Sequence, residues 1–149
     1  MTGRYGLEVR AAAAADAPGL AELWAEAGRP ADPRRLAARL DAVRAAPGAV
    51  LVASDWGPPA GVIALTWAPT LEADAPVAWL STLLVRTEDR RRGVGRLLLK
   101  AGAQVARSAG CERLEIAVGV DAAALEAFCR ATGFAEDGLR LVRPLRKKA

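Results

Sequence analysis

The chain has 149 residues, of which 52% are hydrophobic and 26% are charged, a composition typical of globular proteins and not of disordered ones. Its two cysteines and its lack of histidine exclude a disulfide framework, a four-ligand zinc site and every mechanism that needs a histidine base. We therefore expect residues 1–149 to form a single domain, large enough to bury its core without disulfides or metals.

The net charge of +4 is spread along the chain and does not form one dense basic patch, so we expect no nucleic-acid partner. No segment reaches the uninterrupted apolar length of a membrane-spanning helix, so we expect no membrane partner. The two cysteines, Cys111 and Cys129, are too few for a stabilising framework. Free thiols together with the lack of a secretion signal indicate a cytoplasmic location.

The first third of the chain predicts a short strand and two helices. Residues 7–10 alternate between apolar and polar side chains, as a half-exposed strand does. A helix is expected from an Asp16 N-cap to about Ala27, and a second from an Asp32 N-cap to the Pro47-Gly48 break. Their predicted buried stripes are Leu20, Leu23, Trp24 and Ala27 in the first helix, and Leu36, Leu40 and Val43 in the second.

The middle of the chain predicts three strands. Residues 49–54 and 61–67 flank a Gly-Pro-Pro turn and predict an antiparallel hairpin. Residues 69–76 are expected to form a loop. Residues 77–85 are too continuously apolar for an exposed sheet edge and predict a buried strand.

The last third predicts alternating helices and strands. A helix is expected over residues 93–109, with Gly110 as its C-terminal cap, and a parallel strand over residues 114–118. A final helix is expected from an Asp121 cap to about Thr132, followed by a closing strand over residues 139–145. The expected order is therefore β-α-α-β-β-β-α-β-α-β.

A basic glycine-containing loop stands between the strand at 77–85 and the helix that follows it. Its sequence is Arg90-Arg91-Arg92-Gly93-Val94-Gly95. Amide N–H groups at the start of a helix have no partner within the helix, and the helix dipole adds positive charge there, which favours a bound phosphate. The loop is not the dinucleotide fingerprint, because Leu98 stands where the third glycine belongs, and it lacks the Gly-Lys-Ser/Thr ending of the nucleoside-triphosphate loop. The alternative is an arginine-rich turn whose glycines serve only its geometry.

The pattern Arg-x-x-Gly-x-Gly at the start of a helix resembles the acyl-coenzyme A loop of the GNAT N-acetyltransferase superfamily. A second segment, Ala127-Phe128-Cys129-Arg130-Ala131-Thr132-Gly133-Phe134, is similar to a later family segment, and the two occur in the family's order. The resemblance implies an α+β, three-layer acyl-CoA N-acyltransferase fold. In that fold a mixed, mostly antiparallel central sheet of six to seven strands is flanked by about four helices.

The same resemblance implies an enzyme that moves an acetyl group from acetyl-CoA to a primary amine by direct transfer in a ternary complex, with no metal. Loop amides would hold the pyrophosphate, and the preceding strand would pair with the pantetheine arm. The implied cofactor-binding residues are Leu83, Leu84, Val85, Arg90, Arg91, Arg92, Gly93, Val94, Gly95 and Arg96.

The catalytic acid and base are less well indicated by the sequence. Many relatives carry a tyrosine where this chain has Cys129, whose thiol is either the proton donor for the leaving group or a small buried apolar residue. Glu72 and Glu115 are the first candidates for the base. The alternative is a water ordered by Ser81 and Thr82.

Two other classes of function stay open on the sequence alone. One is a non-catalytic module that senses acyl-CoA, which stays open because Cys129 stands in place of the tyrosine. The other is nucleic-acid binding through the basic surface, for which the chain lacks an aromatic-basic platform. The acceptor is expected to be a small-molecule or peptide amine, and the resemblance makes a homodimer possible.

Overall fold

The computed structural model of the protein describes residues 6–120 and 122–146. They belong to two compact units, residues 1–116 and 117–149, and each unit is described by itself. The expected helix cap at Asp121 lies outside the described residues. The single domain expected for residues 1–149 stays a prediction.

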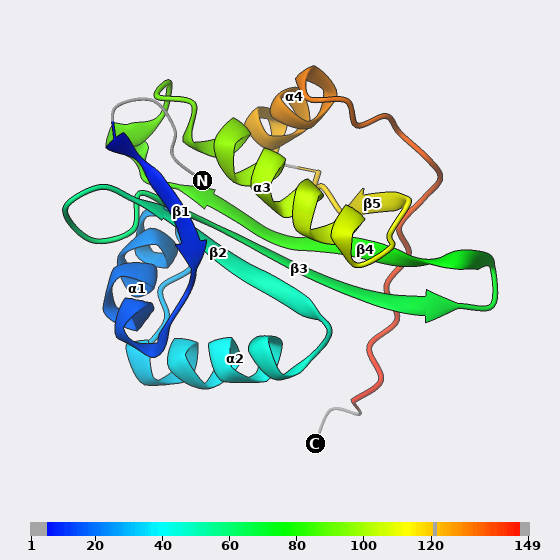
Figure 1. Cartoon of the computed structure of the whole chain (residues 1–149), viewed down its shortest axis with the longest axis horizontal. Helices are drawn as coiled ribbons and strands as arrows, with labels where there is room; N and C mark the ends of the chain where they lie inside the picture. Colours follow the sequence, from blue (N-terminus) through cyan, green and yellow to red (C-terminus); the bar gives the residue numbers. More distant parts are fainter. Residues whose placement is uncertain (1–5, 121, 147–149) are drawn as a thin grey trace. The chain divides into compact units, whose positions relative to one another are not determined.

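The first unit is built on a five-stranded sheet in the order β1-β2-β3-β4-β5 (Figure 1). The first four strands pair antiparallel, and β5 is parallel to β4 because α3 connects them. The strands are β1 (Glu8–Ala11), β2 (Gly48–Ser54), β3 (Gly61–Thr70), β4 (Ala73–Val85) and β5 (Arg113–Ile116). The helices are α1 (Ala17–Glu26), α2 (Pro33–Ala45) and α3 (Val94–Ser108).

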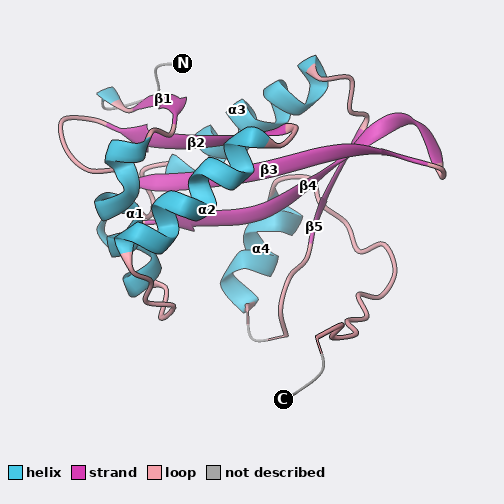
Figure 2. Cartoon of the chain, turned by 90° about the horizontal axis from the view of Figure 1, so that it is seen from below, coloured by secondary structure: helices cyan, strands magenta, loops and turns pink. Residues whose placement is uncertain are grey.

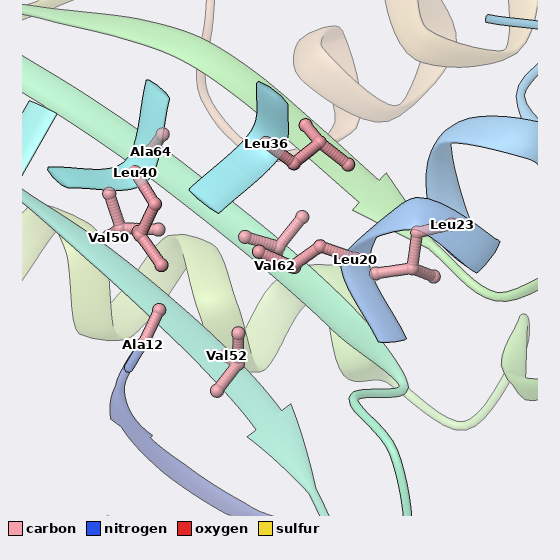
Figure 3. Packing of buried hydrophobic residues seen from close by; sticks show 9 residues of the cluster. All are labelled: Ala12, Leu20, Leu23, Leu36, Leu40, Val50, Val52, Val62 and Ala64. Atoms are coloured by element: carbon pink, nitrogen blue, oxygen red, sulfur yellow. The ribbon is translucent and has the colours of Figure 1, made fainter. Parts of the chain in front are cut away.

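One face of the sheet packs against α1 and α2. Successive strand residues point to opposite faces, and on this face Val62 and Ala64 of β3 join a buried cluster with leucines of both helices (Figure 3). The cluster consists of Ala12, Leu20, Leu23, Leu36, Leu40, Val50, Val52, Val62 and Ala64. It contains the predicted stripes of both helices except Trp24 and Val43, which pack at its margin, and Ala27, which is exposed.

The opposite face of the sheet packs against α3. Gly102 lets the helix approach closely, because a Cβ at that position would lie 2.9 Å from the side chain of Leu65 and 3.1 Å from that of Ile63. Val94 and Leu98 are buried on the same helix face. The α3 helix is thus held firmly over β3, which fixes where its N-terminus lies.

The second unit contains one helix, α4 (Ala123–Ala131), within its described part. Gly133 follows it with a φ of 102°, the left-handed conformation in which helices commonly end. The expected strand over residues 139–145 is wrong, because the structure has no strand there. Its apolar residues Leu139, Leu141 and Leu145 are exposed. Alternating apolar and basic residues allow a strand, but only a partner strand with open hydrogen-bonding groups makes one.

The described residues confirm the expected element order apart from that last strand. The sheet has five strands instead of six to seven, and the four helices α1 to α4 are as expected. The α+β fold class is therefore correct.

The expected loop over residues 69–76 is also wrong, because most of it belongs to a long β3–β4 hairpin. The hairpin turns at Leu71 and Glu72 and projects past the other strands (Figure 2). Pro69 is accommodated by a register shift between Ala68 and Thr70, since a residue without an N–H fits a strand where the pairing is interrupted.

Asp16 does not cap α1 with its side chain. It ends a short 3-10 turn, Ala14–Asp16, and its carboxylate accepts hydrogen bonds from the Ala13 amide at 2.8 Å and from Arg10 at 2.7 and 2.8 Å. The α2 cap is as predicted, with Asp32 Oδ1 accepting from the Arg34 amide at 2.7 Å.

Candidate active site

A split between β4 and β5 opens one edge of the sheet. The parallel pairing of these strands ends with Leu80 opposite Ile116. The next residue of β4, Ser81, is an extra residue in its pairing with β3, which passes from Leu65–Leu80 to Ala64–Thr82. The Ser81 hydroxyl donates to the Ala64 carbonyl at 3.2 Å. Such a bulge bends a strand, and β5 ends at Ile116, so β4 continues past this point without its parallel partner strand.

Beyond the bulge, Leu83, Leu84 and Val85 still pair with β3 on one side. Within the described part of the first unit, no strand pairs with their other side. Leu84 packs against the cluster beneath α1 and α2, which places Leu83 and Val85 on the α3 face by strand alternation. This open edge is where an extended ligand can pair with the main chain.

The open edge leads directly into the basic loop. Residues 87–89 form a 3-10 turn, and Arg91 and Gly93 then adopt left-handed conformations with φ of 73° and 78°. A left-handed arginine is uncommon and is strained, a state often found at functional sites. Gly93 is the N-cap of α3 and offers no side chain to its first turn. The amides of Val94, Gly95 and Arg96 therefore lack partners within the helix.

Ion pairs hold this loop in place. Asp89 is buried, and its carboxylate accepts a short hydrogen bond from Arg92 and lies 3.6 Å from Arg86. Arg92 also pairs with Asp55 at 3.5 Å. Arg86 donates to the carbonyls of two residues in the β2–β3 turn, at 3.2 and 2.8 Å. These contacts fasten the loop to the β2–β3 turn, so its free amides are fixed in space before a ligand arrives.

The arginines of the loop divide into two groups. The hydrogen bond that Arg92 donates to the Asp89 carboxylate, reinforced by the negative charge of Asp89, raises the pKa of Arg92 above its ordinary value, and the Arg92 guanidinium is engaged inside the protein. Arg90, Arg91 and Arg96 are exposed and have no ion pair within the described part of the chain. These exposed arginines belong to the same loop and first helical turn as the unpaired amides, which favours a polyanion such as a diphosphate.

Glu115 lies beside the split. It is paired in register with Trp79, one position before the last β4–β5 pair, and Arg113 Nε donates to its carboxylate at 2.7 Å. Leu114 packs with Ala78 and Ala106 on the α3 face, so Glu115 points to the α1–α2 face. Its carboxylate is therefore next to the open edge and on the opposite face from α3.

Glu72 is not brought to this place within the first unit. It is exposed at the tip of the β3–β4 hairpin, nine residues before Ser81 in the chain, which corresponds to about 30 Å along an extended strand. The structure therefore does not bring the two candidate bases together.

Cys129 lies in α4 of the second unit and is buried. Burial raises the pKa of its thiol, so the thiol stays protonated at neutral pH. A protonated thiol still carries a proton to donate, although the raised pKa makes it a weaker acid, and it is unsuited to attack as a nucleophile.

Sequence reasoning did not identify Arg86, Asp89 or Asp55 as parts of the site. The signal for Asp89 was an acidic residue directly before three arginines, at a spacing that allows it to pair with Arg86 and Arg92. Asp55 had no local signal, since only the fold brings its turn to the loop. Within the described residues, no group of three or more histidine, cysteine or acidic side chains is placed to hold a metal ion.

Comparison with known proteins agrees with this geometry. The family model described as the acetyltransferase (GNAT) family matches residues 17–134. No curated protein matches the chain significantly. Three solved structures show the same fold, as follows.

An acetyltransferase from Trypanosoma brucei is 22% identical, with 93% of this chain and 99% of that chain covered and a TM-score of 0.79. An aminoglycoside N-acetyltransferase in complex with CoA is 18% identical, with coverages of 94% and 95% and a TM-score of 0.80. A glucosamine-6-phosphate N-acetyltransferase from Arabidopsis thaliana is 13% identical, with coverages of 94% and 99% and a TM-score of 0.78.

No helix in the described residues is long and apolar enough to cross a bilayer. The split beside β4, the amide-lined loop and the family match over residues 17–134 lead to one conclusion. This chain belongs to the GNAT family of acetyltransferases and is an acyltransferase that uses acyl-CoA.

Proposed function

We propose that the protein transfers an acetyl group from acetyl-CoA to a primary amine of a small molecule or peptide, by direct attack within a ternary complex. The observation that carries the proposal is the continuity of two features, the open β4 edge beyond Ser81 and the fixed loop of free amides at the start of α3. One extended molecule with a diphosphate at one end and a thioester at the other fits both.

In this proposal the loop residues hold the diphosphate. The amides of Val94, Gly95 and Arg96 donate to it, and Arg90, Arg91 and Arg96 neutralise its charge. Gly93 keeps a side chain away from the place where the phosphates approach. Arg92 acts through Asp89 and Asp55, by fixing the loop.

The pantetheine arm pairs with the main-chain groups of Leu83 and Val85, which aligns the thioester along β4. A main-chain amide near Val85 then polarises the acyl carbonyl. Holding the thioester and the amine side by side accounts for much of the rate, because effective molarities for well-oriented groups reach about 10⁵ M or more.

The amine must lose a proton as it attacks, and Glu115 is the first candidate base because it lies beside the split. Glu72 stays a second candidate. Cys129 is the candidate acid for the leaving thiolate, and its buried, protonated thiol is consistent with that role. A purely apolar role for Cys129 is equally consistent with its burial.

A small-molecule acceptor is supported by two structural neighbours that are named as N-acetyltransferases of aminoglycosides and of glucosamine-6-phosphate. We further propose that the whole chain acts as one domain and that two copies associate. The two free thiols support the proposed cytoplasmic location.

Two measurements test the function. Titration calorimetry should show binding of CoA, and the release of free CoA from acetyl-CoA should accelerate when a panel of primary amines is added. Binding of CoA without turnover across the panel would contradict the transfer reaction. Absence of CoA binding would contradict the assignment of the loop.

A further inference from the structure

A basic hollow lies on the surface between the end of α1 and the start of α2. It has a volume of about 530 Å³, and its lining includes Trp24, Arg29, Asp32, Arg35 and Arg39. We call it the arginine hollow. Nothing in the proposed CoA site uses it.

The charge of the arginine hollow is unbalanced. Its acidic residue, Asp32, caps α2 through a hydrogen bond from the Arg34 amide. Within the described residues, none of the ion pairs includes Arg29, Arg35 or Arg39. Three guanidinium groups therefore face one carboxylate that is already engaged.

The arrangement of these arginines costs stability in the absence of a ligand. Arg35 and Arg39 are four residues apart on α2, so they lie on the same side of the helix and repel each other. The α1–α2 turn adds Arg29, whose guanidinium carbon is 6.0 Å from the centre of the Trp24 ring. An anion between the guanidinium groups would remove this repulsion.

Helix α1, which carries Trp24 of the arginine hollow, is linked to the end of β4. Glu26, the last residue of α1, accepts a hydrogen bond from the Thr87 amide at 3.3 Å, and Thr87 opens the turn that follows β4. Trp24 of the hollow and Leu84 of β4 pack against the same buried cluster. The arginine hollow is therefore on the sheet face to which Glu115 points.

We propose that the arginine hollow binds an oxyanion group, a phosphate or a carboxylate, of the acceptor amine. Guanidinium groups bind both kinds of oxyanion through paired hydrogen bonds, and the Trp24 ring supplies an apolar wall for the rest of the molecule. The acceptor is then an amine with a negative charge at its other end. This inference rests on the proposed transfer to an amine and narrows its substrate class.

The test uses matched pairs of amines that differ only in the anionic group. Suitable pairs are glucosamine 6-phosphate with glucosamine, phosphoethanolamine with ethanolamine, and 4-aminobutyrate with butylamine. Each amine is titrated calorimetrically into the protein saturated with CoA, so that the loop arginines are already occupied, and is then assayed for acetylation. We expect at least one anionic member to bind about tenfold or more tightly than its neutral partner, and the phosphate and carboxylate arms show which oxyanion is preferred.

Matched variants on α2 separate the arginine hollow from general charge effects. Arg35→Ala with Arg39→Ala should remove the preference for the anionic amine, whereas Arg34→Ala with Arg44→Ala changes the net charge equally outside the hollow and should preserve it. All four residues are exposed on a helix in which alanine is favourable, so both double variants should fold. Each preparation is checked by its CoA affinity, which should be unchanged.

The inference is overturned if no anionic amine binds more tightly than its neutral partner, or if both double variants lose the preference equally. Acetylation of neutral amines in that case would leave the proposed function standing. If CoA does not bind, the proposed function fails, and the same titrations without CoA still decide whether the arginine hollow takes oxyanions.

Discussion

Arg92 of the basic loop and Asp55 of the β2–β3 turn form an ion pair at 3.5 Å, although 37 positions of sequence separate them. Asp89 completes the link by pairing with Arg92 from the other side. One arginine of the loop motif thus serves to fix the loop, and its neighbours Arg90 and Arg91 are left for a ligand. This division of roles underlies the predictions for the loop.

Replacing Gly93 with valine should lower the affinity for CoA by about 100-fold or more. A Cβ at Gly93 meets no protein atom within 4 Å, so the branched side chain would occupy the space where the phosphates approach. The left-handed φ adds a strain of about 1–2 kcal/mol. Calorimetry measures the affinity, and urea denaturation measures the stability.

Gly138→Val is the control for this strain, since Gly138 also has a left-handed φ, of 87°, and open space around it. It should cost similar stability and leave the affinity for CoA unchanged. Wild-type affinity in Gly93→Val would mean that the diphosphate does not lie at this loop.

Replacing Asp89 with asparagine should destabilise the protein by about 1–3 kcal/mol, because a buried partner of two arginines loses its charge. The affinity for CoA should fall as well, since the loop is no longer held. Glu88→Gln is the matched control: Glu88 is exposed and pairs with Arg86 at 3.3 Å, and such pairs contribute about 0–1 kcal/mol. Equal effects of the two substitutions would contradict the role given to Asp89.

The Arg10–Asp16 pair should make stability depend on pH in the acid range. Hydrogen bonds from Arg10 lower the pKa of Asp16 below its ordinary value. The resulting stabilisation is fully present above the unfolded-state pKa of about 3.9 and is lost as the pH falls through the lower folded-state value. The difference in free energy of unfolding between wild type and Asp16→Asn should therefore be large at pH 7 and smaller at pH 3. Urea denaturation at both values measures it, and a difference that grows on acidification would refute the assignment.

Replacing Glu115 with glutamine should lower kcat by about 100-fold, the size of effect typical of a general base. The affinity for CoA should stay the same, because Glu115 does not belong to the loop. Glu72→Gln is the comparison, and we expect it to leave kcat close to wild type because Glu72 lies at the hairpin tip. The reverse result would assign the base to the hairpin.

Replacing Cys129 with alanine should decrease the free energy of unfolding by about 1 kcal/mol through lost packing, with kcat within twofold of wild type. Cys111→Ala, which removes another buried thiol, serves as the reference for a purely structural effect. A loss of kcat confined to Cys129→Ala, accompanied by a changed alkaline limb of the pH–rate profile, would identify the thiol as the acid.

The elements most reliably predicted were those whose ends are marked by local chemistry. The start of α2 follows from Asp32 and Pro33, and the limits of α3 follow from Gly93 and Gly110, which have left-handed φ values of 78° and 93°. The strand expected over residues 139–145 failed because apolar alternation does not supply a partner strand. The hairpin over residues 69–76 was missed because two prolines suggested a loop, whereas a register shift accommodates Pro69.

The sequence by itself indicated the glycine-containing loop at the start of α3 and the family, because the left-handed Gly93 and the unpaired helix amides depend on a few consecutive residues. Only the tertiary structure decided that the pairing of β4 with β5 ends just before Ser81, that Asp55 holds the loop through Arg92, and that Arg29, Arg35 and Arg39 line one hollow. The first two features join segments distant in the chain, and the third depends on how α1 and α2 pack against each other, so all three depend on the packing of whole strands and helices. Local residue patterns carry no information about such packing.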